Sequence, residues 1–105
     1  MSTSNCRVGI VMLLYNRSDV AVACVRSLAA AKTDVPWELY LLDNASKVAE
    51  SDLVKAEFER LELEGGINGQ FIRSEINHGF PGGNNLGISY FMGRDDISHL
   101  CLLNS

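Results

Sequence analysis

Ile10-Val11-Met12-Leu13-Leu14-Tyr15-Asn16 contains the first of four apolar runs in this chain, and the run stops on a polar residue. Residues 39–42 stop in the same way on Asp43-Asn44, and residues 100–103 stop on Asn104-Ser105. Short runs rich in branched residues are typical of strands that are covered on both faces, as in a parallel sheet. Polar residues at the carboxyl ends of neighbouring strands line the crevice where open α/β sheets bind ligands. We therefore expect the three polar ends to lie together at one ligand site.

Segments with helical spacing separate the apolar runs. Ser18 can cap the first of these helices. Glu57 lies with other glutamates on the solvated face of the second helix, which Gly65-Gly66 stops. The alternation predicts an α/β fold, a Rossmann-like three-layer α/β/α arrangement with a mostly parallel sheet. In chain order the strands and helices are expected at residues 8–14, 18–31, 37–42, 51–64, 70–73, 84–92 and 99–103.

Composition limits the classes of protein to which this chain can belong. Its 105 residues, 47% hydrophobic and 21% charged, suit one globular domain over residues 1–105. The net charge of -4 argues against nucleic acid as a partner, because general binding of its phosphates needs a basic surface. The apolar residues 8–15 are too few to span a membrane or to form the core of a signal peptide. We interpret Cys6, Cys24 and Cys101 as buried, reduced thiols and expect a cytoplasmic protein.

Residues 77–85, with the sequence Asn-His-Gly-Phe-Pro-Gly-Gly-Asn-Asn, form the most informative loop. Glycine lets the backbone approach a ligand closely. The helix expected from residue 84 would present free amides that favour negative charge. The alternative is a tight turn with a close contact between this helix and the sheet. Because the loop lies between strands that end on polar residues, we favour a ligand site.

Asp43 directly follows residues 39–42 and is expected at the mouth of the sheet. Its carboxylate can accept a hydrogen bond from a ribose hydroxyl or from an imino group of a base. The alternative is that Asp43-Asn44-Ala45-Ser46 is only a turn that the aspartate side chain stabilises. With Asn16 and Asn104 at the ends of neighbouring strands, we favour the ligand interpretation.

Four motifs, taken in this order and spacing, resemble the amino-terminal, nucleotide-sugar-binding half of family 2 glycosyltransferases with the GT-A fold. They are Leu14-Tyr15-Asn16-Arg17, Leu41-Leu42-Asp43-Asn44-Ala45-Ser46, Asn77-x-Gly79-Phe80-x-Gly82-Gly83-Asn84-Asn85-x-Gly87 and Leu102-Leu103-Asn104-Ser105. The glycine motif is most similar to the rhamnosyltransferase-like branch. The resemblance implies an inverting enzyme of polysaccharide biosynthesis, cytoplasmic or peripheral at the membrane. It would transfer a sugar, with rhamnose as a candidate, from a dTDP- or UDP-sugar to a hydroxyl acceptor.

The resemblance also implies which residues bind the donor. Tyr15 and Asn16 would contact the nucleoside, Asp43 would bind the base or ribose, and the glycine loop would lie along the nucleotide and sugar. The implied substrate-binding residues are Tyr15, Asn16, Asp43, Asn44, Ser46, Asn77, Gly79, Gly82, Gly83 and Asn84.

A divalent metal, Mg²⁺ or Mn²⁺, is a further implication of the resemblance for the full-length enzyme. Its motif would begin at Asn104, but the carboxylate expected after Ser105 is absent, so the motif is incomplete. The catalytic base is also expected beyond residue 105. We therefore expect a truncated chain that binds donor nucleotide but holds no stable metal and does not turn over. The alternative is a non-catalytic nucleotide-binding or interaction module.

The last apolar run has a consequence for assembly. If residues 99–103 form a strand that lacks part of its sheet, one edge of it has unpaired backbone groups. Such an edge is a template for another strand. We therefore expect self-association, most simply as a homodimer.

Overall fold

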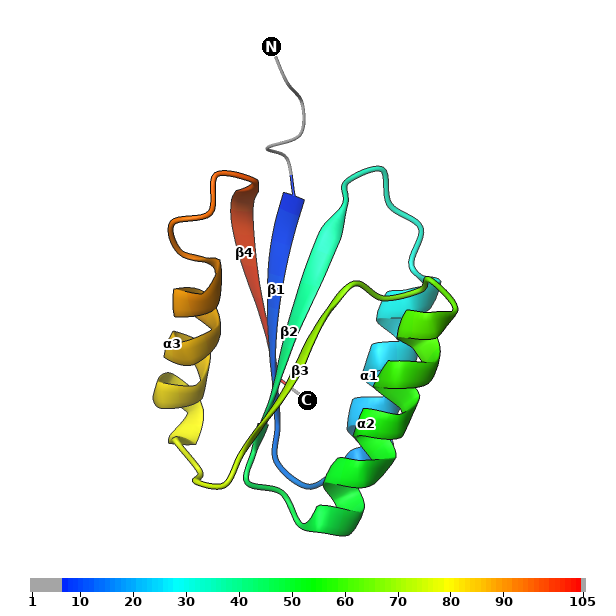
Figure 1. Ribbon diagram of the computed structural model, residues 1–105, viewed down its shortest axis with the longest axis vertical. Helices are drawn as coiled ribbons and strands as arrows, with labels where there is room; N and C mark the ends of the chain where they lie inside the picture. Colours follow the sequence, from blue (N-terminus) through cyan, green and yellow to red (C-terminus); the bar gives the residue numbers. More distant parts are fainter. Residues whose placement is uncertain (1–6, 105) are drawn as a thin grey trace.

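The computed structural model describes residues 7–104, and of Asn104 it describes the backbone alone. Strands and helices alternate along the chain (Figure 1). Their bounds are β1 Arg7–Leu14, α1 Ser18–Ala30, β2 Trp37–Asn44, α2 Val48–Leu63, β3 Gly69–Ser74, α3 Gly79–Phe91 and β4 Ile97–Asn104. None of the helices in this part of the chain is long and apolar enough to cross a bilayer.

The four strands lie parallel in the order β3-β2-β1-β4. The chain places β2 and then β3 on one side of β1, and afterwards returns to the other side of β1 for β4. As a result α1 and α2 cover one face of the sheet and α3 covers the other (Figure 1). The predicted Rossmann-like three-layer α/β/α fold is confirmed. The reversal of strand order between β1 and β4 marks the point where such sheets bind ligands at their carboxyl edge.

The two central strands, β1 and β2, have apolar cores on both sides. Met12 and Leu41 pack with α1 and α2, whereas Val11 and Leu42 pack beneath α3. Each of these four side chains is at most 1% exposed. Because both faces are covered, apolar residues follow one another without the alternation of a half-exposed strand.

The third helix begins earlier than the sequence predicted. α3 starts at Gly79, not at Asn84, so Gly82 and Gly83 belong to its first turns and not to a loop. Gly79 itself has φ 70, a left-handed conformation that glycine adopts without steric cost. The connection between β3 and α3 therefore shortens to residues 75–78.

Close packing on β1 explains two glycines of α3. A Cβ atom on Gly83 would lie 3.0 Å from Leu13 Cδ2, and a Cβ atom on Gly87 would overlap the side chain of Val11. The argument that packing could not account for the glycines was wrong for this reason: the missing side chains let the helix approach the sheet. The helix contact that we gave as the alternative is therefore present, whatever else these residues do.

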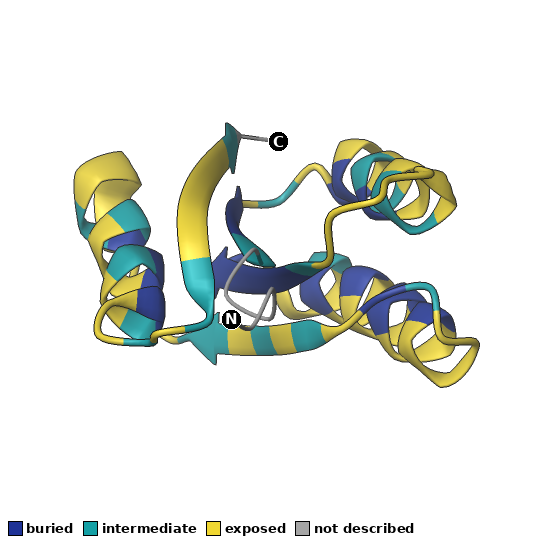
Figure 2. Ribbon diagram, turned by 90° about the horizontal axis from the view of Figure 1, so that it is seen from above, coloured by how far each residue is buried: buried dark blue, intermediate teal, exposed yellow. Residues whose placement is uncertain are grey.

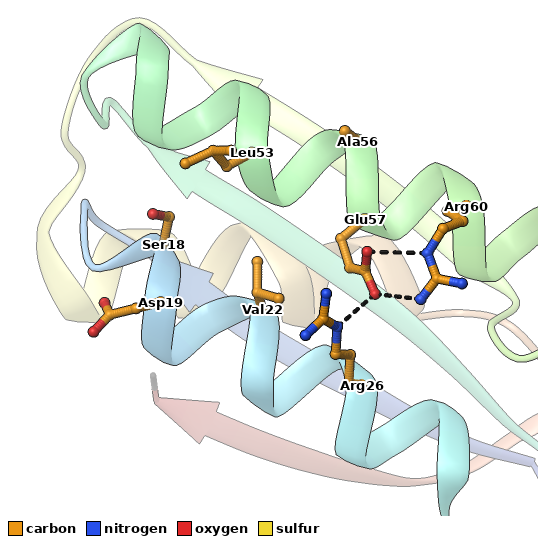
Figure 3. A pocket seen from close by; sticks show the side chains of 8 residues that line it. All are labelled: Ser18, Asp19, Val22, Arg26, Leu53, Ala56, Glu57 and Arg60. Carbon is orange, nitrogen blue, oxygen red and sulfur yellow. Dashed lines mark hydrogen bonds and ion pairs between the residues drawn. The ribbon is translucent and has the colours of Figure 1, made fainter.

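An ion-pair cluster joins α1 to α2. Glu57 is not on a solvated face as predicted, because its side chain is only 10% exposed and lies between the two helices. Its carboxylate accepts hydrogen bonds from Arg26 Nε at 2.7 Å and from Arg60 Nη2 at 2.6 Å (Figure 3). Two guanidinium groups thus neutralise the one carboxylate that the helix contact buries.

A second charge cluster lies at the amino end of the sheet. Glu38 of β2 accepts two hydrogen bonds from Arg94, both at 2.9 Å, and a third from the Tyr90 hydroxyl at 3.1 Å. Arg94 also donates to Asp96, and Asp96 pairs with Arg7 at the start of β1. These contacts fasten the segment after α3 to β1 and β2.

Two smaller expectations were wrong. Ser18 does not cap α1 with its side chain; its backbone N–H instead donates to Glu50 Oε1 of α2 at 3.1 Å. Cys101 is exposed because β4 is an edge strand of the described sheet, and Cys24 of α1 is only partly buried where it packs against the core. Cys6 lies outside the described residues.

The contact between α3 and β1 predicts a strong effect of adding bulk at Gly87. Gly87→Val should force the helix away from Val11 and lower the free energy of unfolding by about 1–3 kcal/mol, the usual cost of overpacking. Chemical denaturation would measure this. Ser89→Val places the same side chain on the exposed side of the same helix and should change stability little. Equal effects of the two substitutions would contradict the packing argument.

The cluster between α1 and α2 predicts a dependence of stability on pH. Hydrogen bonds from Arg60 and then from Arg26 lower the pKa of Glu57 from its ordinary 4.5 to about 2. A carboxyl whose pKa is lower in the folded state stabilises the fold above its unfolded pKa, and this contribution is lost as pH falls through the folded value. As the pH is lowered from about 4.5 to 2, the midpoint temperature of thermal unfolding should therefore decrease. It should decrease less steeply in Glu57→Gln. Glu59→Gln, at an exposed position of α2, should keep the parent slope; a parent slope in Glu57→Gln would contradict the assignment.

Candidate functional site

A fully buried carboxylate anchors the carboxyl edge of the sheet. Asp43 is 0% exposed and stands one residue before the end of β2. Its Oδ2 accepts a hydrogen bond from Arg73 Nη1 at 2.8 Å, and its Oδ1 accepts one from the backbone N–H of Ser46 at 2.9 Å. Arg73 also donates from Nη2 to the carbonyl oxygen of Ser46 at 3.0 Å. The end of β3 is thereby tied to the end of β2 and to the turn that follows it.

The turn after β2 is joined in the same way to the turn after β1. The Ser46 hydroxyl oxygen accepts a hydrogen bond from the backbone N–H of Asn16 at 2.7 Å. In return Asn16 Oδ1 accepts one from the backbone N–H of Lys47 at 2.9 Å. The ends of β1, β2 and β3 therefore form one connected hydrogen-bond network.

This network holds the backbone in left-handed conformations that residues other than glycine rarely adopt. Asn16 has φ 53, Arg17 has φ 46 and Ala45 has φ 69. Left-handed residues other than glycine cost of order 1–3 kcal/mol each and persist only where the surroundings impose them. All three lie in the turns after β1 and β2, so the strain is concentrated at the carboxyl edge.

Asn44 extends the network to the start of α3. Its Oδ1 accepts a hydrogen bond from the backbone N–H of His78 at 2.7 Å, and its Nδ2 donates to the carbonyl oxygen of Gly79 at 3.2 Å. Asn77 Oδ1 accepts from the backbone N–H of Gly79 at 2.7 Å. The amino end of α3 is thus fixed at the carboxyl edge of β2.

Some of the residues expected to bind the donor are buried, and others are exposed to solvent. Asp43, Asn44 and Ser46 are buried, and protein groups already occupy their polar atoms. Tyr15, by contrast, is 56% exposed beside them at the end of β1. Asn77, Gly79 and Gly82 lie at the start of α3, where Asn77 and Gly79 are exposed. The structure thus gathers the predicted residues of the first two strands, with Tyr15 as their largest exposed side chain.

Asn84 has a separate feature. Its Oδ1 is a buried acceptor without a hydrogen-bond partner among residues 7–104. Asn84 follows Gly83, which packs against Leu13 near the end of β1. Asn84 therefore keeps an amide oxygen away from solvent within α3.

The described residues do not make up a metal site. Within residues 7–104 no group of three or more His, Cys, Asp or Glu side chains lies close enough to hold an ion. The backbone of Asn104 lies beside Leu13 in the β1–β4 register. The buried carboxylate at this edge, Asp43, is paired with Arg73.

Arg73 is a residue of this site that the sequence reasoning missed. The sequence does contain a signal for this ion pair, because Asp43 and Arg73 stand at the ends of two predicted strands and have opposite charges. It could not be used without knowing that β2 and β3 are neighbours, a fact that the register Asp43↔Arg73 now supplies.

A groove of about 610 Å³ lies elsewhere, between α1 and α2. Val22, Leu53 and Ala56 line its middle, and the Glu57 cluster closes one end (Figure 3). The charged groups at that end already pair with one another, so we place the site at the carboxyl edge and not in this groove.

The buried ion pair predicts a large effect of removing its cation. Arg73→Met keeps the aliphatic bulk but leaves Asp43 buried without a positive partner. Stability at neutral pH should fall by about 3 kcal/mol, the low end for a buried pair because Arg73 is partly exposed. Denaturation of the double variant Asp43→Asn/Arg73→Met should show part of this loss restored. Arg17→Met, which removes an exposed pair with Asp19, should have almost no effect; similar losses at Arg17 and Arg73 would refute the argument.

Comparison with known proteins gives one match. Neither a curated protein nor a solved structure matches the chain. The model of glycosyl transferase family 2 matches residues 9–104, which include all seven strands and helices except the first two residues of β1. The parallel α/β sheet and the polar network at its carboxyl edge are consistent with that match. The chain therefore belongs to glycosyl transferase family 2, whose members transfer sugars from nucleotide-activated donors.

Proposed function

We propose that the carboxyl edge of β1, β2 and β3 binds the nucleotide of a sugar donor, with UDP or dTDP as the carrier. The observation that carries this proposal is the network around Asp43. It connects three consecutive strand ends and keeps three non-glycine residues in left-handed conformations. Strain of this kind collects at binding sites, because a rigid surface loses little entropy when a ligand binds.

The exposed part of the edge suits a nucleoside. The Tyr15 ring is more than half exposed at the end of β1 and can stack on a base. The contact of Asp43 with the base or ribose, which the family resemblance implies, stays a prediction. The carboxylate has no exposed surface in this conformation, so direct contact would require the turn at Ser46 or the Arg73 side chain to move. In the present arrangement Asp43 positions the turn that borders the base.

The start of α3 suits the diphosphate. Asn44 holds His78 and Gly79 at the carboxyl edge, and the positive end of the α3 dipole lies there. An acidic chain with a net charge of -4 must attract phosphate locally, and the amino end of a helix does this. We propose that Asn77, Gly79 and Gly82 face this part of the donor.

The reaction that we propose is an inverting displacement at the anomeric carbon of the sugar. A base removes the proton of an acceptor hydroxyl, and the hydroxyl oxygen forms a bond to the anomeric carbon. The bond between that carbon and the nucleoside diphosphate breaks on the opposite face of the sugar. Rhamnose is our candidate sugar because of the form of the glycine motif. The buried Asp43 is paired with Arg73 and is therefore not placed to act as that base. We propose that residues 7–104 bind the donor without turning it over.

Calorimetric titration with UDP and dTDP tests the proposal. Tyr15→Ala should weaken binding at least about five-fold, because stacking of a base on an aromatic ring contributes ~1–3 kcal/mol. Met92→Ala truncates another exposed side chain, directly after α3 at the other end of the sheet, and should leave the affinity unchanged.

Two outcomes would count against the proposal. Absence of binding by either nucleotide to the folded chain would overturn the assignment of the edge. Equal losses in the Tyr15 and Met92 variants would show that binding does not involve the end of β1.

A further inference from the structure

His78 lies at the carboxyl edge of the sheet, in the connection between β3 and α3. Its backbone N–H donates to Asn44 Oδ1 at 2.7 Å, so the residue is attached to the end of β2. Residues 75–81 are all exposed. Figure 2 shows that α3, which follows, turns its buried residues toward the sheet and its exposed residues outward. The His78 side chain is thus open to solvent at the part of the edge that we propose for the diphosphate.

Two contacts hold the His78 ring in place. Its Nε2 lies 2.9 Å from the hydroxyl oxygen of Ser74, the last residue of β3. Gly82 lies one turn further along α3, where a Cβ atom would lie only 3.1 Å from His78 Cβ. A surface side chain without such contacts loses rotamer entropy when a ligand orders it. The ring of His78 is instead positioned before a ligand arrives.

The hydroxyl of Ser74 determines which ring nitrogen carries a proton. A hydroxyl has one proton to donate and two lone pairs that accept. The Ser74 hydroxyl donates to the carbonyl oxygen of Ile76 at 2.7 Å and accepts from the backbone N–H of Ile76 at 3.1 Å. Because its one proton is used on Ile76, the contact with His78 is a hydrogen bond that Nε2–H donates to the Ser74 oxygen. Nδ1 therefore holds the lone pair of the neutral ring.

Nδ1 is the ring nitrogen that remains for a ligand. It has no hydrogen-bond partner among residues 7–104. In the neutral ring Nδ1 repels a phosphate oxygen, because both atoms present lone pairs. In the protonated ring the same nitrogen donates a charge-assisted hydrogen bond to that oxygen. An anion at this place therefore favours the addition of a proton to Nδ1.

The charged groups on the neighbouring elements have partners of their own. Arg73 of β3 pairs with Glu75 of the connection and with Asp43 of β2, and Glu38 lies at the opposite end of β2. The helix α3 contains no charged residue. Its amino end favours an anion and disfavours a cation. Within residues 7–104 no carboxylate pairs with His78, so a bound phosphate would be the first anionic partner of the protonated ring.

We propose that His78 binds a phosphate oxygen of the nucleotide-sugar donor through Nδ1 and takes up one proton from solvent as the donor binds. This inference rests on the proposed function, because the proposed donor supplies the diphosphate. The proton leaves a water or buffer molecule and forms the new N–H bond on Nδ1, and no other bond changes. The imidazolium then offsets one negative charge of the diphosphate in a chain whose own net charge is -4.

Calorimetric titration of the 105-residue chain with UDP and dTDP, in buffers of different ionisation enthalpy, tests the inference. At pH 7 the parent should take up more protons per bound nucleotide than His78→Gln, by a difference of up to one. The ratio of the parent's affinity to that of His78→Gln should increase at least about three-fold from pH 8 to pH 6, where histidine gains its charge. The terminal phosphate of either nucleotide also titrates in this range, but it contributes to both proteins alike.

His99→Gln is the matched control. His99 is the other histidine of the chain, exposed on β4, and its Nδ1 also lies beside a serine hydroxyl, that of Ser98 at 3.0 Å. The His99 variant should match the parent in proton uptake and in the pH dependence of its affinity. Circular dichroism melting must show that both variants fold.

The outcomes separate this inference from the proposed function. Binding that Tyr15→Ala weakens, with equal proton uptake by the parent and His78→Gln, would overturn the role of His78 alone. A parent whose advantage over His78→Gln decreases on acidification would also overturn it, because Nδ1 would then accept a hydrogen bond from a hydroxyl. Absence of binding by both nucleotides would overturn the two proposals together.

Discussion

The ion pair between Asp43 and Arg73 is the interaction on which the carboxyl edge depends. A carboxylate without exposed surface must have compensation for the water that it gives up, and Arg73 with the Ser46 amide supplies it. These partners come from β3 and from the turn after β2, so the Asp43 carboxylate ties the end of β2 both to β3 and to that turn. Through Ser46 the same restraint reaches the turn after β1.

The consequence is a candidate binding surface on which most polar groups form hydrogen bonds within the protein. Asp43, Asn44 and Ser46 shape the turns, and the exposed Tyr15 and the start of α3 remain to face a ligand. A residue can therefore be essential to such a site while its main contacts are with neighbouring loops. A sequence motif alone does not show whether a residue contacts the ligand or positions the residues that do.

Sequence patterns were sufficient for the architecture, whereas the place of the ligand site stays a prediction. Because β1 and β2 are buried on both faces, their sequences are continuous apolar runs, and the polar residues that end these two runs do lie together. The sequence patterns gave wrong predictions where a residue of one helix packs or pairs with a different helix or strand. Glu57 has the same local surroundings as Glu59, yet only Glu57 meets an arginine of another helix. Gly83 was predicted to lie in a ligand-binding loop, because nothing nearby in the sequence shows that Leu13 packs against it.

The Glu38 and Arg94 cluster stands at the end of the sheet opposite the candidate site. It joins the segment after α3 to the beginnings of β1 and β2, so it holds the layers together without touching the strand ends of the candidate site. Anchorage and recognition are thus carried by separate groups of side chains. Under the proposed function, residues at the candidate site can be exchanged during evolution so that a different sugar or base is accepted, while the far end continues to secure the same scaffold.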